Sequence, residues 1–133
     1  MVADAHNDLA NVLYADGVYD QAKRHYTAAL TLYTTRLGEA HPELGKPHNN
    51  LSGLLHDMGE HQQASVLFKQ ALHIARINRG LYHESHISIV DDIITAEVAL
   101  QNWEQVNNYY AYQELLYNRL YDTDDPRLEV GLR

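Results

Sequence analysis

The sequence contains no cysteine, which excludes both a disulfide framework and a metal site built from thiolates. It has no apolar stretch long enough to span a membrane, and its first residues lack the basic segment and unbroken apolar run of a signal peptide. We therefore expect a soluble protein that does not bind membranes. The absence of cysteine is compatible with the cytoplasm and with the periplasm, so the compartment stays open.

Lysine and arginine are scarce. The 133 residues include 10 of them against 18 aspartate and glutamate residues, which gives a formal net charge of -8. Proteins that bind nucleic acid or anionic membranes need clustered basic side chains to neutralise phosphate groups. The composition therefore disfavours both partners and favours a neutral or basic ligand. The length, with a hydrophobic content of 45%, suits a single domain.

The short patterns that carry catalysis are also missing. The sequence has no G-x-S-x-G nucleophile elbow, no glycine-rich phosphate loop and no H-E-x-x-H zinc pattern. Acidic pairs such as Asp91-Asp92 are explained more simply as charges on a solvated helix face. We predict a protein that is not an enzyme and needs no cofactor.

What the sequence does contain is an internal repeat. When it is shifted by 42 positions, many residues fall on an identical residue. The matching pairs include His6 and His48, Gly17 and Gly59, Ala22 and Ala64, Ala29 and Ala71, Gly38 and Gly80, and His41 and His83. A fixed period in this range is typical of stacked arrays, in which each unit buries its apolar face only against its neighbours.

The apolar spacing and the glycines predict two helices in each unit. A first helix over residues 4–16 has Leu9 and Val12 on its apolar face, and Gly17 ends it. A second helix is expected over residues 19–37, where the glycine that follows suits a left-handed C-terminal residue. The second unit repeats this arrangement, so each unit is expected to form one helical hairpin.

The third unit departs from the first two at its turn. The turn reads Gln101-Asn102-Trp103 and lacks the glycine. Asparagine tolerates the left-handed region better than most residues, so we expect Asn102 to take that conformation. Trp103 is expected to pack between the two helices of its unit.

The third unit also differs at its core positions. The repeat alignment places Tyr110 in the core as the equivalent of Tyr26. Glu97 and Glu114, however, stand where the second unit has leucines. We therefore expect this unit to pack differently or to be partly solvated.

The repeat gives three units, over residues 3–44, 45–86 and 87–125. Residues 126–133 read as the start of a fourth unit, because Asp125-Pro126 lies 84 positions after His41-Pro42. On this interpretation the chain is a fragment of a longer protein. The alternative is a short helix that caps the array, since terminal repeats are often atypical.

The clear units share a small residue, an aromatic residue four positions later and an alanine three positions after that. These residues are Ala22, Tyr26 and Ala29 in the first unit and Ala64, Phe68 and Ala71 in the second. An LG-x-x-HP linker leads into the second unit, which has an NNL helix start and a final AL-x-I. These motifs resemble the tetratricopeptide repeat, and specifically the 42-residue repeats of kinesin light chain and related bacterial proteins.

The resemblance is most specific over residues 37–74, and residues 71–128 are more loosely similar to the C-terminal part of bacterial tetratricopeptide proteins. It implies an all-α fold, namely a right-handed superhelical stack of about three helix-turn-helix hairpins. It also implies a non-catalytic module that binds a peptide or protein segment in a concave groove lined by the first helix of each repeat.

The residues that this resemblance places in the groove are Asn7, Asn11, Tyr14, Asn49, Asn50, His56, Asp91 and Asp92. Asparagine suits the role because its amide both donates and accepts hydrogen bonds, so it can hold a peptide backbone whatever the side chains are. The carboxylate-clamp members of the family rely on lysine and arginine in the groove. Here the corresponding positions are acidic or neutral, which again favours a neutral or basic peptide.

Two other hypotheses stay open. Self-association through the exposed ends of the array, by way of the tyrosine-rich third unit, predicts a homo-oligomer. Nine histidines, among them His83 and His86, suggest a metal site. However, His6 with His48 and His41 with His83 are repeat-equivalent pairs, so each pair is explained more simply as one structural position used twice.

Overall fold

The computed structural model describes residues 2–121, which form six α-helices and one short 3-10 helix. In chain order these are α1 (Val2–Ala15), α2 (Tyr19–Leu37), η1 (Pro42–Leu44), α3 (Gly45–Asp57), α4 (His61–Arg79), α5 (Ser85–Ala99) and α6 (Trp103–Leu120). This part of the chain contains no strand, so the all-α prediction is confirmed. None of these described helices is long and apolar enough to cross a membrane. The expected fourth unit at 126–133 lies outside the described residues.

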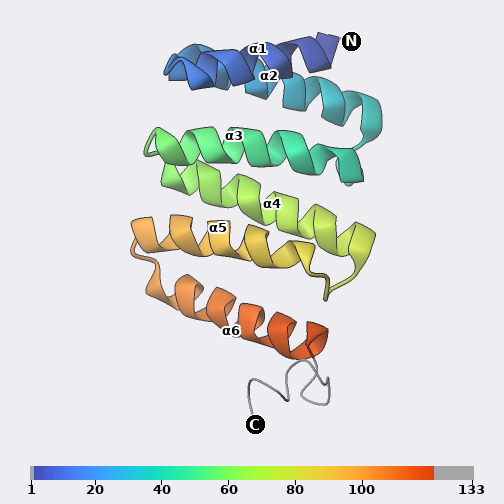
Figure 1. Ribbon diagram of the computed structural model, residues 1–133, viewed down its shortest axis with the longest axis vertical. Coiled ribbons are helices and arrows are strands. Elements are labelled where there is room, and N and C mark those ends of the chain that lie inside the picture. The colour runs from blue at the N-terminus through green and yellow to red at the C-terminus, as the bar shows by residue number, and fades with distance from the viewer. Residues whose placement is uncertain (1, 122–133) are drawn as a thin grey trace.

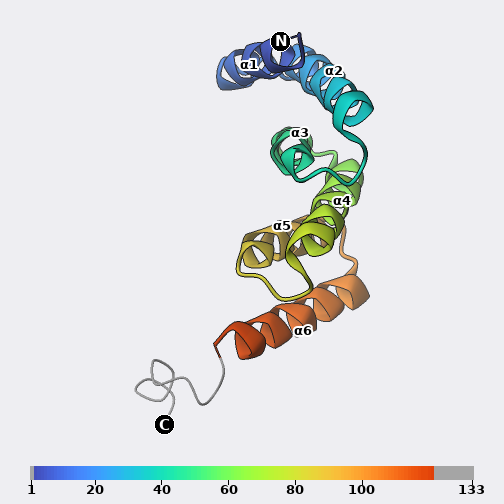
Figure 2. The same ribbon diagram turned by 90° about the vertical axis from the view of Figure 1, so that its right-hand side faces the viewer.

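The helices pair into three hairpins, α1 with α2, α3 with α4, and α5 with α6, which follow one another along the long axis (Figure 1). Neighbouring hairpins are joined by the packing of α3 against α2 and of α5 against α4. Figure 2 shows that the stack is curved, with α1, α3 and α5 along its inner side and α2 and α4 along its outer side. The stack of hairpins expected from the repeat is therefore confirmed.

The turn inside each hairpin depends on one residue with a left-handed backbone. Gly17 and Gly59 both have φ 79°, and Gln101 has φ 60°. Gln101 follows Gly59 by the 42-residue period, so the third turn keeps the geometry of the first two. The expectation that Asn102 takes this conformation is wrong. The place of a residue in the turn, and not the preference of its side chain, determines which residue is left-handed.

The core confirms the pattern of small and aromatic residues in the first two units. Ala22 and Ala64 are fully buried, and Tyr26 and Phe68 are only 3% and 5% exposed. Small residues let the two helices of a hairpin approach closely, while the aromatic ring fills the larger space beside them. The repeated spacing in the sequence is therefore a packing pattern.

The buried face of α1 differs from the expected one. Leu9 and Val12 are exposed, whereas Ala3 and Ala10 are buried. α1 is the first helix of the described stack and packs mainly against α2, so it has one large neighbour instead of two. Its alanines make that close contact, and the larger apolar side chains face outward.

Two aromatic residues of the third unit are also more exposed than the sequence predicted. Trp103 is 57% exposed and Tyr110 is 54% exposed, although both were expected to be packed inside. α2 and α4 are each followed by a hairpin that packs on them, but no described helix packs on the far side of α6. Tyr110 is equivalent to the buried Tyr26 and Phe68, so the missing covering helix accounts for its exposure. Trp103 is equivalent to Tyr19, which is exposed, and to His61, which is partly buried, so its position in the hairpin is open in every unit.

Glu97 is buried in the core between α4 and α5. Its carboxylate accepts hydrogen bonds from Ser65 and, at 2.9 Å, from Nδ2 of Asn102, and Nζ of Lys69 lies 3.2 Å away. Burial by itself raises the pKa of Glu97, but these hydrogen bonds and the charge of Lys69 lower it overall. The third unit therefore packs differently from the second, which has Leu55 at this position, as the sequence indicated.

The equivalent turns provide a matched pair of substitutions. A Cβ added at Gly59 would meet nothing within 4 Å, so Gly59→Gln should destabilise the protein by about 1 kcal/mol through backbone conformation alone. Gln101→Gly should stabilise it by about 0.5 kcal/mol, because the strain it removes exceeds the added entropy of the unfolded chain. Urea denaturation of both variants measures these changes. A Gly59→Gln protein as stable as the wild type would contradict the left-handed turn.

Candidate functional site

A groove with a volume of about 1030 Å³ opens between α3 and α5, and the C-terminal half of α4 lines it from behind. α3 contributes Lys46 and Asn49, and α5 contributes Ser88, Ile89 and Asp92. Residues three or four apart share one face of a helix, which is why each helix presents these particular side chains together. The groove therefore combines amide, hydroxyl, charged and apolar groups on the inner side of the stack.

The charges of the groove are mixed, and its most perturbed group is an acid. Asp92 is half-buried, and its pKa is raised by burial and by the nearby charge of Asp91, while His56 acts in the opposite direction. Lys46 and Arg79 are the basic residues in the lining. A carboxylate that is poorly solvated gains from a ligand that supplies an N–H donor or a positive charge.

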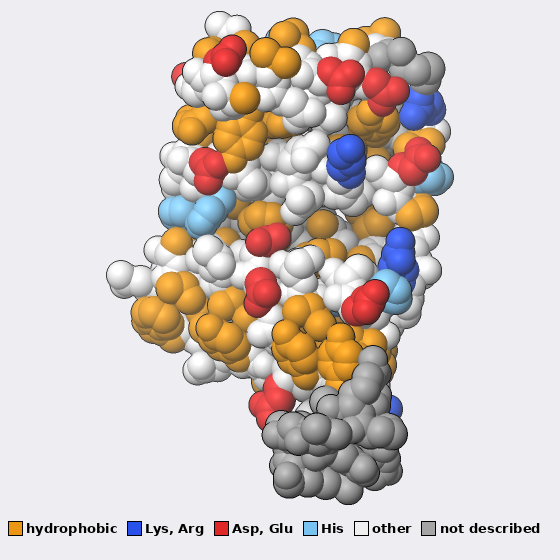
Figure 3. Space-filling view, viewed as in Figure 1, with side chains coloured by type: hydrophobic (Ala, Val, Ile, Leu, Met, Phe, Trp, Pro, Cys, Tyr) orange, Lys and Arg blue, Asp and Glu red, His pale blue; other side chains and the backbone are white. Residues whose placement is uncertain are grey.

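Figure 3 shows the inner side of the stack. Acidic side chains are spread over its upper and middle parts, and hydrophobic side chains gather lower down, over α6. The polar groove and the apolar part of this face are therefore separate surfaces.

Of the eight residues predicted to form the groove, Asn49 and Asp92 are the two that line it. Asn50 instead faces the first hairpin, where its Nδ2 donates a hydrogen bond to Oδ1 of Asn7 at 3.2 Å. This bond joins α1 to α3 across two units. The amides of Asn7 and Asn50 therefore contribute to the stacking of the units.

The other four predicted residues each have a partner within the chain. Oδ1 of Asn11 accepts a hydrogen bond from the hydroxyl of Tyr26 at 2.5 Å, and Oδ1 of Asp91 accepts one from Gln113 at 2.6 Å. The hydroxyl of Tyr14 donates a hydrogen bond to Asp57. Nδ1 of His56 lies 2.9 Å from Nδ1 of His61. Burial and the Asp57 contact raise the pKa of Tyr14.

The sequence analysis missed several residues of the groove, among them Lys46, Ser88 and Ile89. The signal was present, because Lys46 precedes Asn49 by three positions and Ser88 precedes Asp92 by four, and such residues share a helix face. Arg79, which α4 contributes, had no such signal. It belongs to a second helix, and only the packing of α4 behind the groove brings it there.

The histidines do not form a cluster of metal ligands in the described part of the chain. Within residues 2–121, no three side chains of His, Asp or Glu lie close enough together to hold a metal ion. Nδ1 of His6 is instead 2.9 Å from Nδ1 of His25, which links α1 to α2, and the rings are stacked. The metal hypothesis gains no support from this arrangement.

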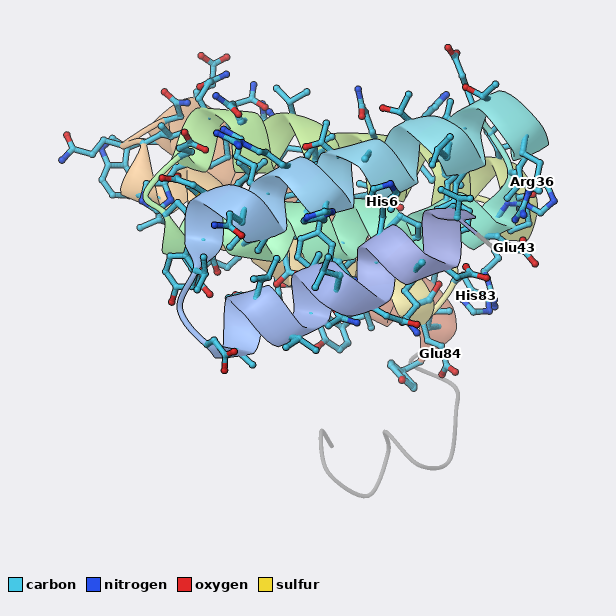
Figure 4. All side chains as sticks on the ribbon, turned by 90° about the horizontal axis from the view of Figure 1, so that it is seen from above. His6, Arg36, Glu43, His83 and Glu84 are labelled. Atoms are coloured by element: carbon cyan, nitrogen blue, oxygen red, sulfur yellow. The ribbon has the colours of Figure 1, made fainter. Side chains whose placement is uncertain are left out.

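One of the repeat-equivalent histidine pairs is a structural position used twice, as expected. Nδ1 of His41 accepts a hydrogen bond from the backbone N–H of Glu43, and Nδ1 of His83 accepts one from Ser85, at 3.1 Å in each case. Both residues precede the first turn of a helical segment. Figure 4 shows His83 and Glu84 at the end of the molecule where Arg36 and Glu43 also lie, so the linkers between hairpins gather at one end.

Three stacked helical hairpins with a polar groove on the inner side define a helical-repeat protein. The tetratricopeptide repeat family matches residues 1–77, which is more than half of the chain, and the chain belongs to this family. Together with the 42-residue period, this match confirms the resemblance to tetratricopeptide repeats of the kinesin-light-chain type. Members of the family are typically non-catalytic scaffolds that mediate protein–protein interactions.

The fold is similar to that of a solved protein, "BtubC (BKLC) from P. vanneervenii", with a TM-score of 0.77 and 15% sequence identity. The match covers 90% of this chain and 47% of that protein, so the chain spans about half of its length. At this identity the similarity concerns the fold alone. A comparison with curated proteins finds no match.

The raised pKa of Asp92 predicts a pH-dependent effect on stability. A carboxyl whose pKa is higher in the folded state than in the unfolded state lowers stability as the pH rises through that window, and the loss persists at pH 7. Asp92→Asn should therefore raise the melting temperature at about pH 7 and leave it unchanged at about pH 3, where both side chains are neutral. Thermal unfolding followed by circular dichroism measures this, and a lower melting temperature of the variant at neutral pH would contradict the prediction.

Proposed function

We propose that the chain is a non-catalytic binding module that holds a peptide or protein segment in the groove between α3 and α5. The observation that carries the proposal is the presence of Asn49 and Asp92 in one groove, on two successive first helices. The Asn49 amide can donate to a peptide carbonyl and accept from a peptide N–H. Asp92 can accept from an N–H group or pair with a basic side chain.

The charge of the chain favours a neutral or basic segment. A net charge of -8 attracts basic partners over a distance and repels acidic ones. Within the groove, Lys46 and Arg79 lie at the level of α3 and α4, whereas Asp92 and Glu84 lie at α5 and its linker. A segment with a basic residue toward α5 would match this distribution.

An array of short synthetic peptides with neutral, basic and acidic sequences tests this function. Because Asn50 is bonded to Asn7, the groove variant is Asn49→Ala with Asp92→Ala. We expect this variant to bind the best neutral or basic peptides at least about tenfold more weakly, which corresponds to roughly 1.4 kcal/mol.

The matched control is Asp20→Ala with Asn107→Ala, which removes the same two residue types from exposed positions on α2 and α6. It should bind like the wild type. Equal binding by the groove variant and the control would exclude the groove, and a preference for acidic peptides would exclude the proposed ligand charge.

Self-association is the second candidate, and the exposed aromatic side chains of α6 favour it. Trp103, Tyr110 and Tyr117 are spaced by seven residues and so form one stripe along the helix. Tyr110 is equivalent to Phe68, which is buried in the hairpin before. A second copy of the chain could cover this stripe by pairing α6 with α6 about a twofold axis.

Sedimentation velocity tests this second candidate. The wild type should sediment as a dimer, and Tyr110→Lys should shift it to a monomer, because a charge in the middle of an apolar contact is costly. Ile77→Lys is the control, since Ile77 is equally exposed but lies on α4. A monomeric wild type at high concentration would exclude self-association through α6.

A further inference from the structure

α1 carries an exposed apolar stripe. Val2, Leu9 and Val12 are 67%, 45% and 58% exposed, and Ala5 is exposed as well. Because they are spaced by three and four positions, these four side chains form one row along the helix. A contiguous exposed apolar row marks an interaction site, whereas single exposed apolar residues need no explanation. This row, the α1 stripe, is separate from the groove between α3 and α5 and plays no part in the function proposed above.

The 42-residue period shows which contact the α1 stripe lacks. Its four equivalents in the second unit are all buried, namely Leu44, Pro47, Leu51 and Leu54. α3 packs on α2 and α5 packs on α4, but no described helix precedes α1, which forms the top of the stack in Figure 1. The packing inside the hairpin is shared by all units, so the difference in exposure comes from the preceding helix. The α1 stripe is therefore the face that lies against a preceding second helix in the other units.

The internal junctions show the chemistry of a helix that covers such a stripe. Both ion pairs among residues 2–121 run from a lysine of a second helix to a carboxylate of the hairpin that follows. Nζ of Lys23 on α2 lies 3.0 Å from Glu60, and Nζ of Lys69 on α4 lies 3.2 Å from Glu97. At both junctions the second helix supplies the positive charge and the following hairpin supplies the negative charge.

α1 has the charge that a basic helix complements. Its charged residues are Asp4 and Asp8, it contains no lysine or arginine, and Asp16 follows it in the turn. Asp8 lies beside the stripe, because it precedes Val12 by four positions. Asp8 and Asp16 are exposed and make no ion pair within residues 2–121. An apolar row on a helix that carries only negative charge favours a partner with lysine or arginine beside its own apolar face.

A second copy of this chain complements the α1 stripe poorly. Its uncovered second helix is α6, in which Asn107 and Ala111 stand at the positions of Lys23 and Lys69. Glu114 replaces the leucine that α2 and α4 share at that position. α6 therefore lacks both the positive charges and one apolar side chain of the internal junctions. Two α1 helices would place carboxylates against carboxylates.

We propose that the α1 stripe docks a basic amphipathic helix of a partner protein, in the position that α2 takes against α3 and α4 takes against α5. The apolar face of that helix combines small side chains with a larger one, as in α2 and α4, and packs on Leu9 and Val12. Its lysine or arginine side chains lie beside Asp8 and Asp16.

A synthetic peptide with the sequence of residues 61–79 is the probe. α4 carries Lys69, Arg76 and Arg79 and no acidic residue, and its apolar face already covers a stripe of this type on α5. The fluorescence anisotropy of the labelled peptide measures its binding to the whole chain, and we expect saturable binding. The same peptide with its three basic residues changed to glutamate should bind at least about tenfold more weakly. No saturable binding of the basic peptide overturns the proposal.

Two variants of the chain locate the site. Leu9→Asp removes an apolar contact while it adds negative charge, and it should weaken binding of the basic peptide at least about tenfold. Ile77→Asp is the matched control, since Ile77 is similarly exposed but lies on α4, and it should bind like the wild type. Equal binding by the two variants overturns the α1 stripe as the site. Asp8→Lys should weaken binding at least about threefold at low salt, and unchanged binding overturns the role of charge.

The groove variant, Asn49→Ala with Asp92→Ala, separates this site from the inner groove. It should bind the basic peptide like the wild type. Weaker binding by the groove variant, with unchanged binding by Leu9→Asp, assigns the peptide to the inner groove and overturns docking on α1. This result leaves the function of the inner groove intact, so the two proposals fail separately.

The remaining outcomes concern folding and the identity of the occupant. Val12→Asp replaces Leu9→Asp if circular dichroism shows that the latter does not fold. If neither variant folds, the two side chains are required by the fold, which overturns a free docking surface. Tighter binding of a peptide of residues 103–120 than of residues 61–79 identifies α6 of a second copy as the occupant and overturns a basic partner.

Discussion

The structure depends on the packing of each hairpin on the one before it, through α3 on α2 and α5 on α4. Tyr26 and Phe68 are nearly inaccessible where a hairpin follows, and Tyr110 is 54% exposed where no described helix follows. The free energy of burial is therefore supplied by the neighbouring unit and not by the hairpin alone. In the described residues the third hairpin therefore leaves exposed the aromatic position that is covered in the first two.

The same stacking creates two clefts. A groove lies between the first helices α3 and α5, and a cleft lies between the second helices α2 and α4. Gln70 lines the α2–α4 cleft, and its equivalent in the third unit is Tyr112, whose hydroxyl donates a hydrogen bond to the backbone carbonyl of Leu81.

Much of the fold could be predicted because the relevant signals are local. The period of 42 residues, the glycines at the turns and the alternation of small and aromatic residues all lie within one unit. The wrong predictions concern positions whose neighbours vary along the array. Leu9 and Tyr110 have the expected spacing, but the helices beside them differ from those beside Leu51 and Phe68 in the middle unit. The repeat alignment assumes equal surroundings, and this assumption fails at both ends of the described stack.

The helices, their pairing into hairpins and the order of the stack could be predicted from the amino-acid sequence, because hydrophobic periodicity and turn residues act over a few residues. The family resemblance put Asn49 and Asn50 together in the groove. In the packed structure Asn49 lines the groove, whereas Asn50 is hydrogen-bonded to Asn7. Consecutive residues of an α-helix point about 100° apart. Which of them faces a groove therefore depends on the rotation of each helix against its neighbours, and that rotation results from packing across the whole stack.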